Sequence, residues 1–166
     1  MEIFKHLIEN LNLKEHPEGG FYKEVFRSNL KIKKEFLPLK YKNDRCLFTS
    51  IYFLLYGNKF SAFHKLKSDE IWHFYEGTRL LIHIIENKYS VKTIRLGDDL
   101  ENGDTFQTVI KSGHWFAAEV EDKNSYSLVG CTVSPGFEYD DFELGKRSRL
   151  IRLYPKHKKI IERLTR

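Results

Sequence analysis

Residues 59 to 77, KFSAFHKLKSDEIWHFYEG, hold side chains suited to acid–base chemistry. His64 can act as a base because an imidazole titrates near neutral pH, and a neighbouring carboxylate such as Glu70 would orient the ring and raise its pKa. Apolar and polar residues alternate around them, which predicts two strands joined by a polar turn. We expect His64 and Glu70 to share one cavity as a catalytic pair; the structural alternative is that His64 bonds a turn and Glu70 a lysine.

Strand geometry assigns further residues to the same cavity. Successive side chains of a strand point to opposite faces, so Trp72 and Phe74 face the cavity if Glu70 does. The odd-numbered residues from 71 to 75 would then point away. Trp72 would stack on a sugar ring or another flat ligand, or it would simply fill the barrel.

Two other stretches supply candidate ligand-binding side chains. Gln107 and His114 belong to QTVIKSGHWFAAE, which we expect to form the facing wall. Each would either bind the ligand or be a polar group at a strand end. Tyr52 lies in the strand-like run TSIYFLLYG, where an inward phenol would need a buried hydrogen-bond partner. Together with Trp72 and Phe74, these residues form the predicted substrate-binding set.

The elements that would position these residues are short strands. The sequence shows about eight of them, with turn signals every 8 to 12 residues and no helical segment between them to make parallel crossovers. This pattern predicts an all-β, antiparallel sandwich or jelly-roll barrel. Apart from the stretch at 59 to 77, the clearest strand patterns lie at residues 21–27, 49–57, 78–85, 89–95, 107–110, 114–120 and 126–133.

Short helices flank the predicted barrel. Residues 3 to 11 place apolar side chains on one stripe, which predicts an amphipathic helix packed on the outside of a sheet. Pro155 would open a final helix with Ile160, Ile161 and Leu164 on one side. The pair Gly19-Gly20 indicates positive φ angles or a close approach of two backbone segments.

The overall composition fits a single domain. A chain of 166 residues can bury one core, so residues 1–166 are expected to form one domain. Cys46 and Cys131 are far apart and lack metal-ligand spacing, which excludes a disulfide framework and a structural zinc. No apolar run approaches the roughly 18 residues of a membrane span, and the N-terminus lacks a signal-peptide pattern. We expect a cytoplasmic protein without a membrane partner.

The positive charge is concentrated in the C-terminal segment. Residues 146 to 166 hold nine lysines and arginines and one acid, while the whole chain carries +5. A basic segment can bind nucleic acid. No aromatic or glycine interleaving typical of RNA-binding motifs accompanies it. We therefore favour a solvated helix face and rank nucleic-acid binding last.

The spacing around His64 resembles the first motif of the cupin superfamily, which reads G, HxH, a short gap, Glu, six residues, Gly. Here His64, Leu66, Glu70 and Gly77 occupy these positions, so the second histidine is replaced by leucine. The second cupin motif, PxGxxH, aligns with residues 111 to 116. Its proline and histidine are both replaced, the histidine by Phe116.

The stretches HPEGGFYKE, SAFHKLKSDEIWHFYEG, GHWFAAE and LVGCTVSPGFEYDDFEL look like the uncharacterised DUF985 (Cupin_5) family, over nearly the whole chain. This resemblance implies a double-stranded β-helix, usually a homodimer, with an internal cavity and no settled reaction. Epimerase-like cupins use a histidine oriented by an acid, with a tyrosine as partner acid. Asp140 or Asp141, and Tyr52 or Tyr75, would fill those roles.

Three functional hypotheses follow. The leading one is a small-molecule-binding cupin that uses His64 as general base in carbohydrate or nucleotide-sugar epimerisation or isomerisation, with Glu70 tuning it. The second is a non-catalytic ligand sensor or storage protein. The third is a metal-dependent enzyme with His64, Glu70 and His114 as ligands of a divalent metal, because a cupin metal site needs about three convergent donors. We favour the metal-free pair.

Overall fold

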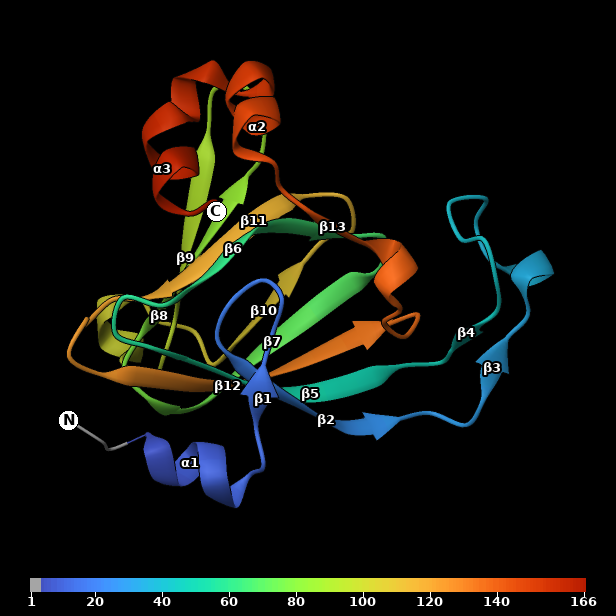
Figure 1. Cartoon of the computed structure of the whole chain (residues 1–166), viewed down its shortest axis with the longest axis horizontal. Helices are drawn as coiled ribbons and strands as arrows, with labels where there is room; N and C mark the ends of the chain where they lie inside the picture. Colours follow the sequence, from blue (N-terminus) through green and yellow to red (C-terminus); the bar gives the residue numbers. More distant parts are fainter. Residues whose placement is uncertain (1–3) are drawn as a thin grey trace.

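The computed structural model describes residues 4–166 and shows two antiparallel sheets that close into a barrel (Figure 1). The six-stranded sheet has the strand order β1-β2-β5-β12-β7-β10, formed by Lys14–Glu15, Phe21–Arg27, Thr49–Tyr56, Tyr126–Ser134, Asp69–Gly77 and Gln107–Ile110. The five-stranded sheet has the order β13-β6-β11-β8-β9, formed by Phe142–Leu144, Phe60–Leu66, Trp115–Val120, Leu80–Ile85 and Val91–Leu96. The predicted all-β jelly roll is confirmed.

Strands β6 and β7 follow each other in the chain but lie in different sheets. Only Lys67 and Ser68 separate them, and β6 pairs with β11 and β13 whereas β7 pairs with β10 and β12. The stretch predicted as two strands therefore crosses from one layer to the other. Its inward side chains face each other across the barrel instead of lying side by side.

The main core lies between the two sheets. Phe53, Trp72, Ile82 and Phe116 are almost completely buried there, with partly buried side chains such as Phe74 packed against them. Both sheets place alternate residues inward, as the apolar alternation predicts. This dense packing fills one part of the barrel and leaves a hollow at the other.

Helices cover the outer faces of both sheets (Figure 1). Helix α1, Lys5–Asn10, places Leu7 in a cluster with Leu54 and Leu128 on the outside of the six-stranded sheet, as predicted; Ile3 of the predicted helix lies outside the described residues. At the other end, helices α2, Arg147–Leu153, and α3, Lys158–Arg163, cover the five-stranded sheet. The sequence predicted α3 but missed α2.

The basic C-terminal segment packs against the barrel. Leu150 and Ile161 are fully buried against Phe63. Within residues 4–166, no helix is long and apolar enough to cross a membrane.

The loop between β1 and β2 runs close to the barrel wall. Gly19 and Gly20 both have positive φ, of 116° and 73°. A Cβ atom at Gly19 would overlap the carbonyl oxygen of Phe60 on β6, so only glycine fits there. The predicted close approach is confirmed, and it brings the preceding residue, Glu18, beside β6.

Residues 29–46 form an arm that projects from the barrel (Figure 1). It contains β3, Lys31–Ile32, a 3-10 turn at Lys34–Phe36, and β4, Arg45–Cys46. Arg45 at its base is buried and donates to both oxygens of Asp141, at 2.5 and 2.8 Å. This ion pair anchors the arm to the loop that follows β12.

Candidate functional site

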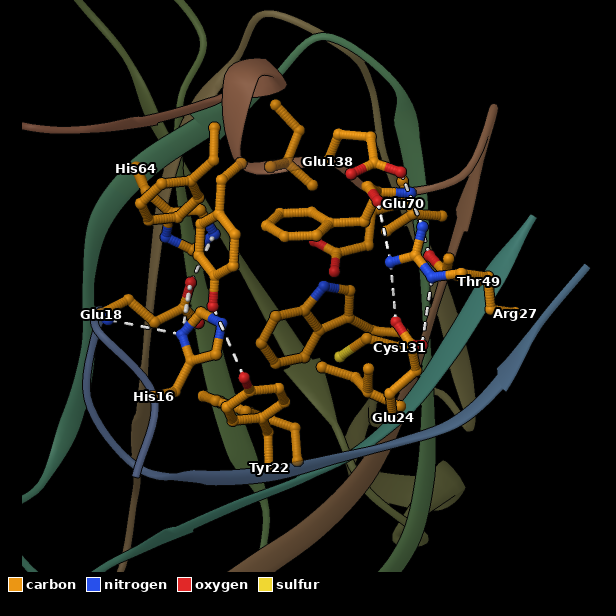
Figure 2. Close-up of a pocket in the computed structure, with 18 residues that line it drawn as sticks. His16, Glu18, Tyr22, Glu24, Arg27, Thr49, His64, Glu70, Cys131 and Glu138 are labelled. Carbon is orange, nitrogen blue, oxygen red and sulfur yellow. Dashed lines mark hydrogen bonds and ion pairs between the residues drawn. The ribbon is translucent and has the colours of Figure 1, made fainter. Parts of the chain in front are cut away.

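A cavity of about 110 Å³ opens between the two sheets. Figure 2 shows the side chains that line it, with His64 and Glu18 on one side and Glu70 on the other. Rings make up much of the remaining wall: Tyr22, Phe53, Trp72, Phe137, Tyr139 and Phe142. His64 and Glu70 thus share one hollow, although they come from different sheets.

His64 is held rigidly on β6. Its ring is 2% exposed and packs against Phe116 and Phe142, with ring centroids 4.1 and 5.4 Å away. Nδ1 lies 2.8 Å from the carbonyl oxygen of Ala62, which can only accept, so the neutral ring carries its proton on Nδ1. Nε2 then presents a lone pair. Burial lowers the pKa of His64 to about 4, partly opposed by the Ala62 bond.

Glu18 is the carboxyl nearest to His64. One oxygen, Oε2, lies 3.3 Å from His64 Nε2 and 3.5 Å from Nδ1 of His16. The other oxygen accepts a hydrogen bond from Ser61 Oγ at 2.7 Å. Burial raises the pKa of Glu18, and His16 and Ser61 oppose the rise. Because His64 stays unprotonated at neutral pH, its contact with Glu18 is not an ion pair in the resting protein.

The pairing predicted from the sequence is therefore wrong in one respect. Glu70 was expected to orient His64, but Glu18 occupies that place. The physical reason is the crossing of the chain between sheets, which carries Glu70 to the opposite wall. The sequence leaves open whether His16, Glu18 and Arg27 lie at the barrel mouth or fix the entry of the first strand. It does not pair Glu18 with His64, because that contact spans 46 residues of sequence.

Glu70 lies on β7 and is 6% exposed. Burial raises its pKa to about 8; the nearby Trp72 indole opposes this rise and the Glu18 carboxyl adds to it. The indole lies near Glu70 without forming a hydrogen bond to it. Glu70 Oε2 and Trp72 Nε1 both have no hydrogen-bond partner within the described part of the chain. Two buried polar atoms are thus left without partners on this wall.

The predicted substrate-binding residues divide into two groups. Trp72 lines the cavity, and Phe74 faces the same interior but packs into the core beyond it. Tyr52 points to the outer face toward Tyr75, with ring centroids 6.0 Å apart. Its neighbours Ile51 and Phe53 line the cavity, so strand alternation turns Tyr52 away.

Gln107 and His114 also lie away from the cavity, contrary to the prediction. Gln107 is exposed on β10, an edge strand opposite His73. His114 lies in the turn before β11, with Nδ1 3.3 Å from the carbonyl oxygen of Lys111. Neither belongs to the residues that line the hollow. In a sequence, a polar residue at the end of a strand interrupts the apolar pattern just as a ligand-binding residue does. The sequence alone therefore could not distinguish the two for Gln107 and His114.

The partner acids considered for His64 are engaged elsewhere. Asp141 binds Arg45 and, at 3.2 Å, Lys67. Asp140 is exposed, and Tyr75 is exposed on the outer face of β7. The tyrosines that line the cavity are instead Tyr22 and Tyr139, whose hydroxyl oxygens are 3.5 Å apart.

An ion-pair cluster surrounds Arg27 at the edge of the cavity (Figure 2). Its guanidinium donates to both carboxylate oxygens of Glu24, at 3.1 and 2.8 Å, and to Glu138 at 2.7 Å. It also donates to the carbonyl oxygen of Phe137 at 3.2 Å. These contacts raise the pKa of Arg27 above its usual range, and they use most of its donors.

The donors needed for a cupin metal centre do not converge here. The two motif positions replaced in the sequence hold Leu66, which lines the cavity, and Phe116, which packs on His64. His114, the proposed third ligand, lies outside. Residues 4–166 contain no group of three His, Cys, Asp or Glu side chains placed to hold a metal ion. The side chains present do not fit a three-donor metal site.

Comparison with known proteins gives a consistent result. Residues 5–145 match the family described as Cupin superfamily (DUF985). A protein of known structure from Shewanella oneidensis is 39% identical, with a TM-score of 0.88 over 100% of this chain and 99% of that chain. An uncharacterised protein of Saccharomyces cerevisiae is 28% identical over 147 residues, which cover 82% of this chain and 72% of the yeast protein.

A more distant structure shares the fold alone. It is a Klebsiella pneumoniae protein with a double-stranded β-helix domain. It is 12% identical, with a TM-score of 0.53 over 82% of this chain and 93% of that chain.

Proposed function

Because the chain belongs to the DUF985 family of the cupin superfamily, we propose that its barrel binds a small polar molecule and moves a proton on it. His64 is the general base in this proposal. The reaction is an isomerisation or epimerisation next to a carbonyl group, and carbohydrates are the substrate class. A jelly roll hosts many chemistries, so the proposal rests on the cavity and not on the fold.

The observation that carries the proposal is the opposition of His64 and Glu70 across one cavity. The two groups differ in the direction of their pKa shifts, to about 4 for His64 and to about 8 for Glu70. At neutral pH the imidazole is therefore neutral while the carboxyl keeps its proton. Titratable groups whose environments separate their pKa values in this way are suited to act as base and acid.

The proton movements balance without a cofactor. His64 Nε2 takes a proton from the carbon next to the carbonyl, and the C–H electrons form the enol double bond. Glu70 donates its proton to the carbonyl oxygen as that oxygen gains charge. Return of a proton from His64 to carbon, with the enol O–H proton passing back to Glu70, gives the isomer or epimer and restores both groups. Glu18 would act as a positioning residue, because its carboxylate stabilises the imidazolium formed at 3.3 Å.

The size of the cavity limits what it can enclose. A volume of about 110 Å³ corresponds to about four water molecules at roughly 30 Å³ each. The cavity can therefore enclose the reacting part of a small sugar, and the rest of the ring would extend through its opening. The nucleotide of a nucleotide sugar would have to remain outside.

Proton exchange in deuterated water tests the proposal. Incubation with a panel of keto sugars and keto-sugar nucleotides should lead to deuterium at the carbon next to the carbonyl in at least one of them. His64→Gln should reduce this rate by about 10²-fold or more. His73→Gln is the matched control, because His73 lies on β7 and does not line the cavity. If no compound takes up deuterium, the proposed catalysis is refuted.

A non-catalytic binding protein is the second candidate. Both nitrogens of His64 lie near protein oxygens, at 2.8 Å from Ala62 and 3.3 Å from Glu18, as expected of a structural histidine. In that case His64→Gln would weaken ligand binding, and no exchange would occur with wild-type protein. Calorimetric binding measured beside the exchange assay separates the two candidates.

We also propose that the protein forms a homodimer through its projecting arm. The arm and the adjoining strand β2 expose large apolar side chains, among them Phe26, Phe36, Leu39 and Phe48. Phe26 and Phe48 stack with their ring centroids 5.1 Å apart. Light scattering after gel filtration should give twice the chain mass of 19.8 kDa, and a monomer at micromolar concentration would refute the dimer.

A further inference from the structure

The ionisable side chains that line the cavity are mostly acidic. Four carboxyl side chains face it, those of Glu18, Glu24, Glu70 and Glu138, against the single guanidinium of Arg27. No lysine of residues 4–166 lines it. A buried anion needs a positive partner, so an anionic ligand would meet carboxyl groups instead of the cation it requires.

Arg27 does not supply that missing positive partner. Its Nε and Nη2 atoms bind Glu24, its Nη1 atom binds Glu138, and Nη2 also contacts the carbonyl oxygen of Phe137. A guanidinium has five N–H donors and cannot lose its charge. With most donors in use between two carboxylates, Arg27 cannot clamp a phosphate or carboxylate without breaking these bonds.

In the part of the chain that the structure describes, two buried polar atoms on the cavity wall lack hydrogen-bond partners, which a ligand could supply. Glu70 Oε2 and Trp72 Nε1 have no hydrogen-bond partner among the described residues, and their side chains are 6% and 1% exposed. Both side chains line the hollow. A carboxylate oxygen is completed by a donor, and an indole N–H is completed by an acceptor. The ligand must therefore offer one of each.

Aromatic rings surround these atoms. Trp72, Tyr22, Tyr139 and Phe142 line the same hollow, and the face of such a ring attracts a cation that has lost its water shell. An excess of carboxyl groups, a saturated arginine and a wall of rings all favour positive charge.

We propose that the cavity takes a small organic ammonium compound that also carries a hydroxyl or carbonyl oxygen. The ammonium group binds the carboxylate of Glu70, and the oxygen accepts the Trp72 N–H. The proposal concerns the cavity assigned above and adds the charge and the polar groups of a ligand. It does not rest on the proposed reaction, because Glu70 is ionised when an ammonium group is bound and cannot then act as the acid.

Binding of such a ligand changes the proton count in a defined way. Glu70 is protonated before binding at neutral pH and ionised when paired with ammonium, so its proton is released to solvent. Affinity should rise by roughly 50-fold from pH 6 to pH 8, because only the ionised carboxyl forms the pair. Glu18, His64 and Cys131 face Glu70 from the β1–β2 loop, β6 and β12. Of these, burial raises the pKa of Glu18, the lowered pKa of His64 keeps the imidazole neutral, and burial keeps the Cys131 thiol protonated.

A matched series of ring compounds tests the charge. The probes are trans-2-aminocyclohexanol, cyclohexane-1,2-diol and 2-hydroxycyclohexane-1-carboxylate, which share size and hydroxyl group but carry positive, zero and negative charge. None has a carbonyl next to a reactive C–H, so binding is measured without turnover. Calorimetry at pH 8 should show the amine at least tenfold tighter than the diol, with the hydroxy acid weakest. Tighter binding of the acid, or no binding of the amine, would overturn the proposal.

Variants identify the contacts. Glu70→Gln should remove the preference for the amine over the diol, while Glu143→Gln, which removes a carboxyl that lies on β13 outside the cavity, should retain it. Trp72→Phe keeps a ring and deletes the N–H. It should bind aminocyclohexanol and cyclohexylamine equally, whereas the wild type should prefer the first. An amine preference that survives Glu70→Gln in a folded protein would contradict the assignment.

The outcome for the ligand is separable from the outcome for catalysis. Deuterium exchange into a neutral or anionic carbonyl compound, with no amine binding, would leave the proposed reaction standing and overturn the ammonium ligand. Amine binding that depends on Glu70, with no exchange into any keto sugar or keto-sugar nucleotide, would leave the ligand standing and refute the reaction.

Discussion

Glu70→Gln should make the protein more resistant to unfolding at alkaline pH. The carboxyl titrates at about 8 in the folded chain, against an ordinary value of 4.5. Between these values the folded state binds more protons than the unfolded state, so stability falls as pH rises. One proton over one pH unit is worth about 1.4 kcal/mol. The step from pH 6.5 to pH 8 therefore costs the wild type about 2 kcal/mol through this group alone.

Glutamine removes this pH-dependent loss of stability and changes few other interactions. It has nearly the same shape as a protonated carboxyl, and Oε2 of Glu70 makes no hydrogen bond that the substitution could break within the described chain. At about pH 4 or below, where the carboxyl is protonated in most folded and unfolded molecules, the variant and the wild type should therefore be about equally stable. His64 acts in the opposite direction, because its lowered pKa removes stability as pH falls below 6.5. Its contribution is common to both proteins and cancels in the comparison.

Urea unfolding at pH 6.5 and pH 8 measures the effect. The wild type should lose about 2 kcal/mol more free energy of unfolding than Glu70→Gln across this interval. Glu143→Gln serves as the control, because this half-exposed carboxyl pairs with Lys65 and Arg149 at the surface and should follow the wild type. If all three proteins show parallel pH dependence, Glu70 ionises normally and the assignment of a proton to it at neutral pH is refuted.

Three further predictions concern the surroundings of the site. Glu18→Gln should lower the rate of deuterium exchange by about 10²-fold and shift its pH profile, with ligand affinity changed less; an unchanged profile would remove Glu18 from the mechanism. Gly19→Ala should destabilise the fold by about 1–3 kcal/mol, because the backbone at residue 19 has a positive φ and leaves no room for a Cβ atom. Thermal unfolding measures this, and an unchanged melting temperature would contradict it. Asp141→Asn should lower the free energy of unfolding by about 3–5 kcal/mol, because Arg45 would stay buried without its ion partner. Urea unfolding measures this change, and a decrease below about 1 kcal/mol would show that the ion pair is dispensable.

The fold could be predicted from the sequence because local patterns carry it. Alternation predicts the strand at 21–27, and a run of β-branched, aromatic and other apolar residues predicts the strand at 49–57; they correspond to β2 and β5. The residues between 78 and 95 form the expected hairpin of β8 and β9. Helix α2 was missed because basic side chains dominate its seven residues and only Leu150 is buried. An apolar stripe that narrow gives no periodic signal.

The cavity could be predicted only in part. His64, Glu70 and Trp72 line it because strand parity fixes which side chains point inward, and parity is visible in a sequence. Parity could not reveal that β6 and β7 lie in different sheets, nor which distant loop meets His64. For Tyr52, the strand was recognised but the face was not, because the run from 49 to 56 is apolar on both sides. A strand covered on both faces gives no alternation from which to choose.

The two replaced motif positions make the surroundings of His64 apolar and so favour its neutral form. In the cupin motif that this chain resembles, polar histidines stand where Leu66 and Phe116 lie here. Phe116 packs 4.1 Å from the imidazole, and the apolar surroundings remove water from it. Loss of hydration is the largest influence on this ring, and it favours the neutral form.

A neutral imidazole with its proton fixed on Nδ1 by Ala62 has its lone pair on Nε2, which lies 3.3 Å from Glu18 Oε2. A proton accepted by Nε2 is therefore placed next to the Glu18 carboxylate, which stabilises the cation that forms. The same burial acts on Glu70 in the opposite sense and keeps it protonated. Replacement of motif ligands by apolar side chains thus produces a base and an acid facing each other from the two sheets. The geometry requires no group other than the chain's own residues to hold both protons in place.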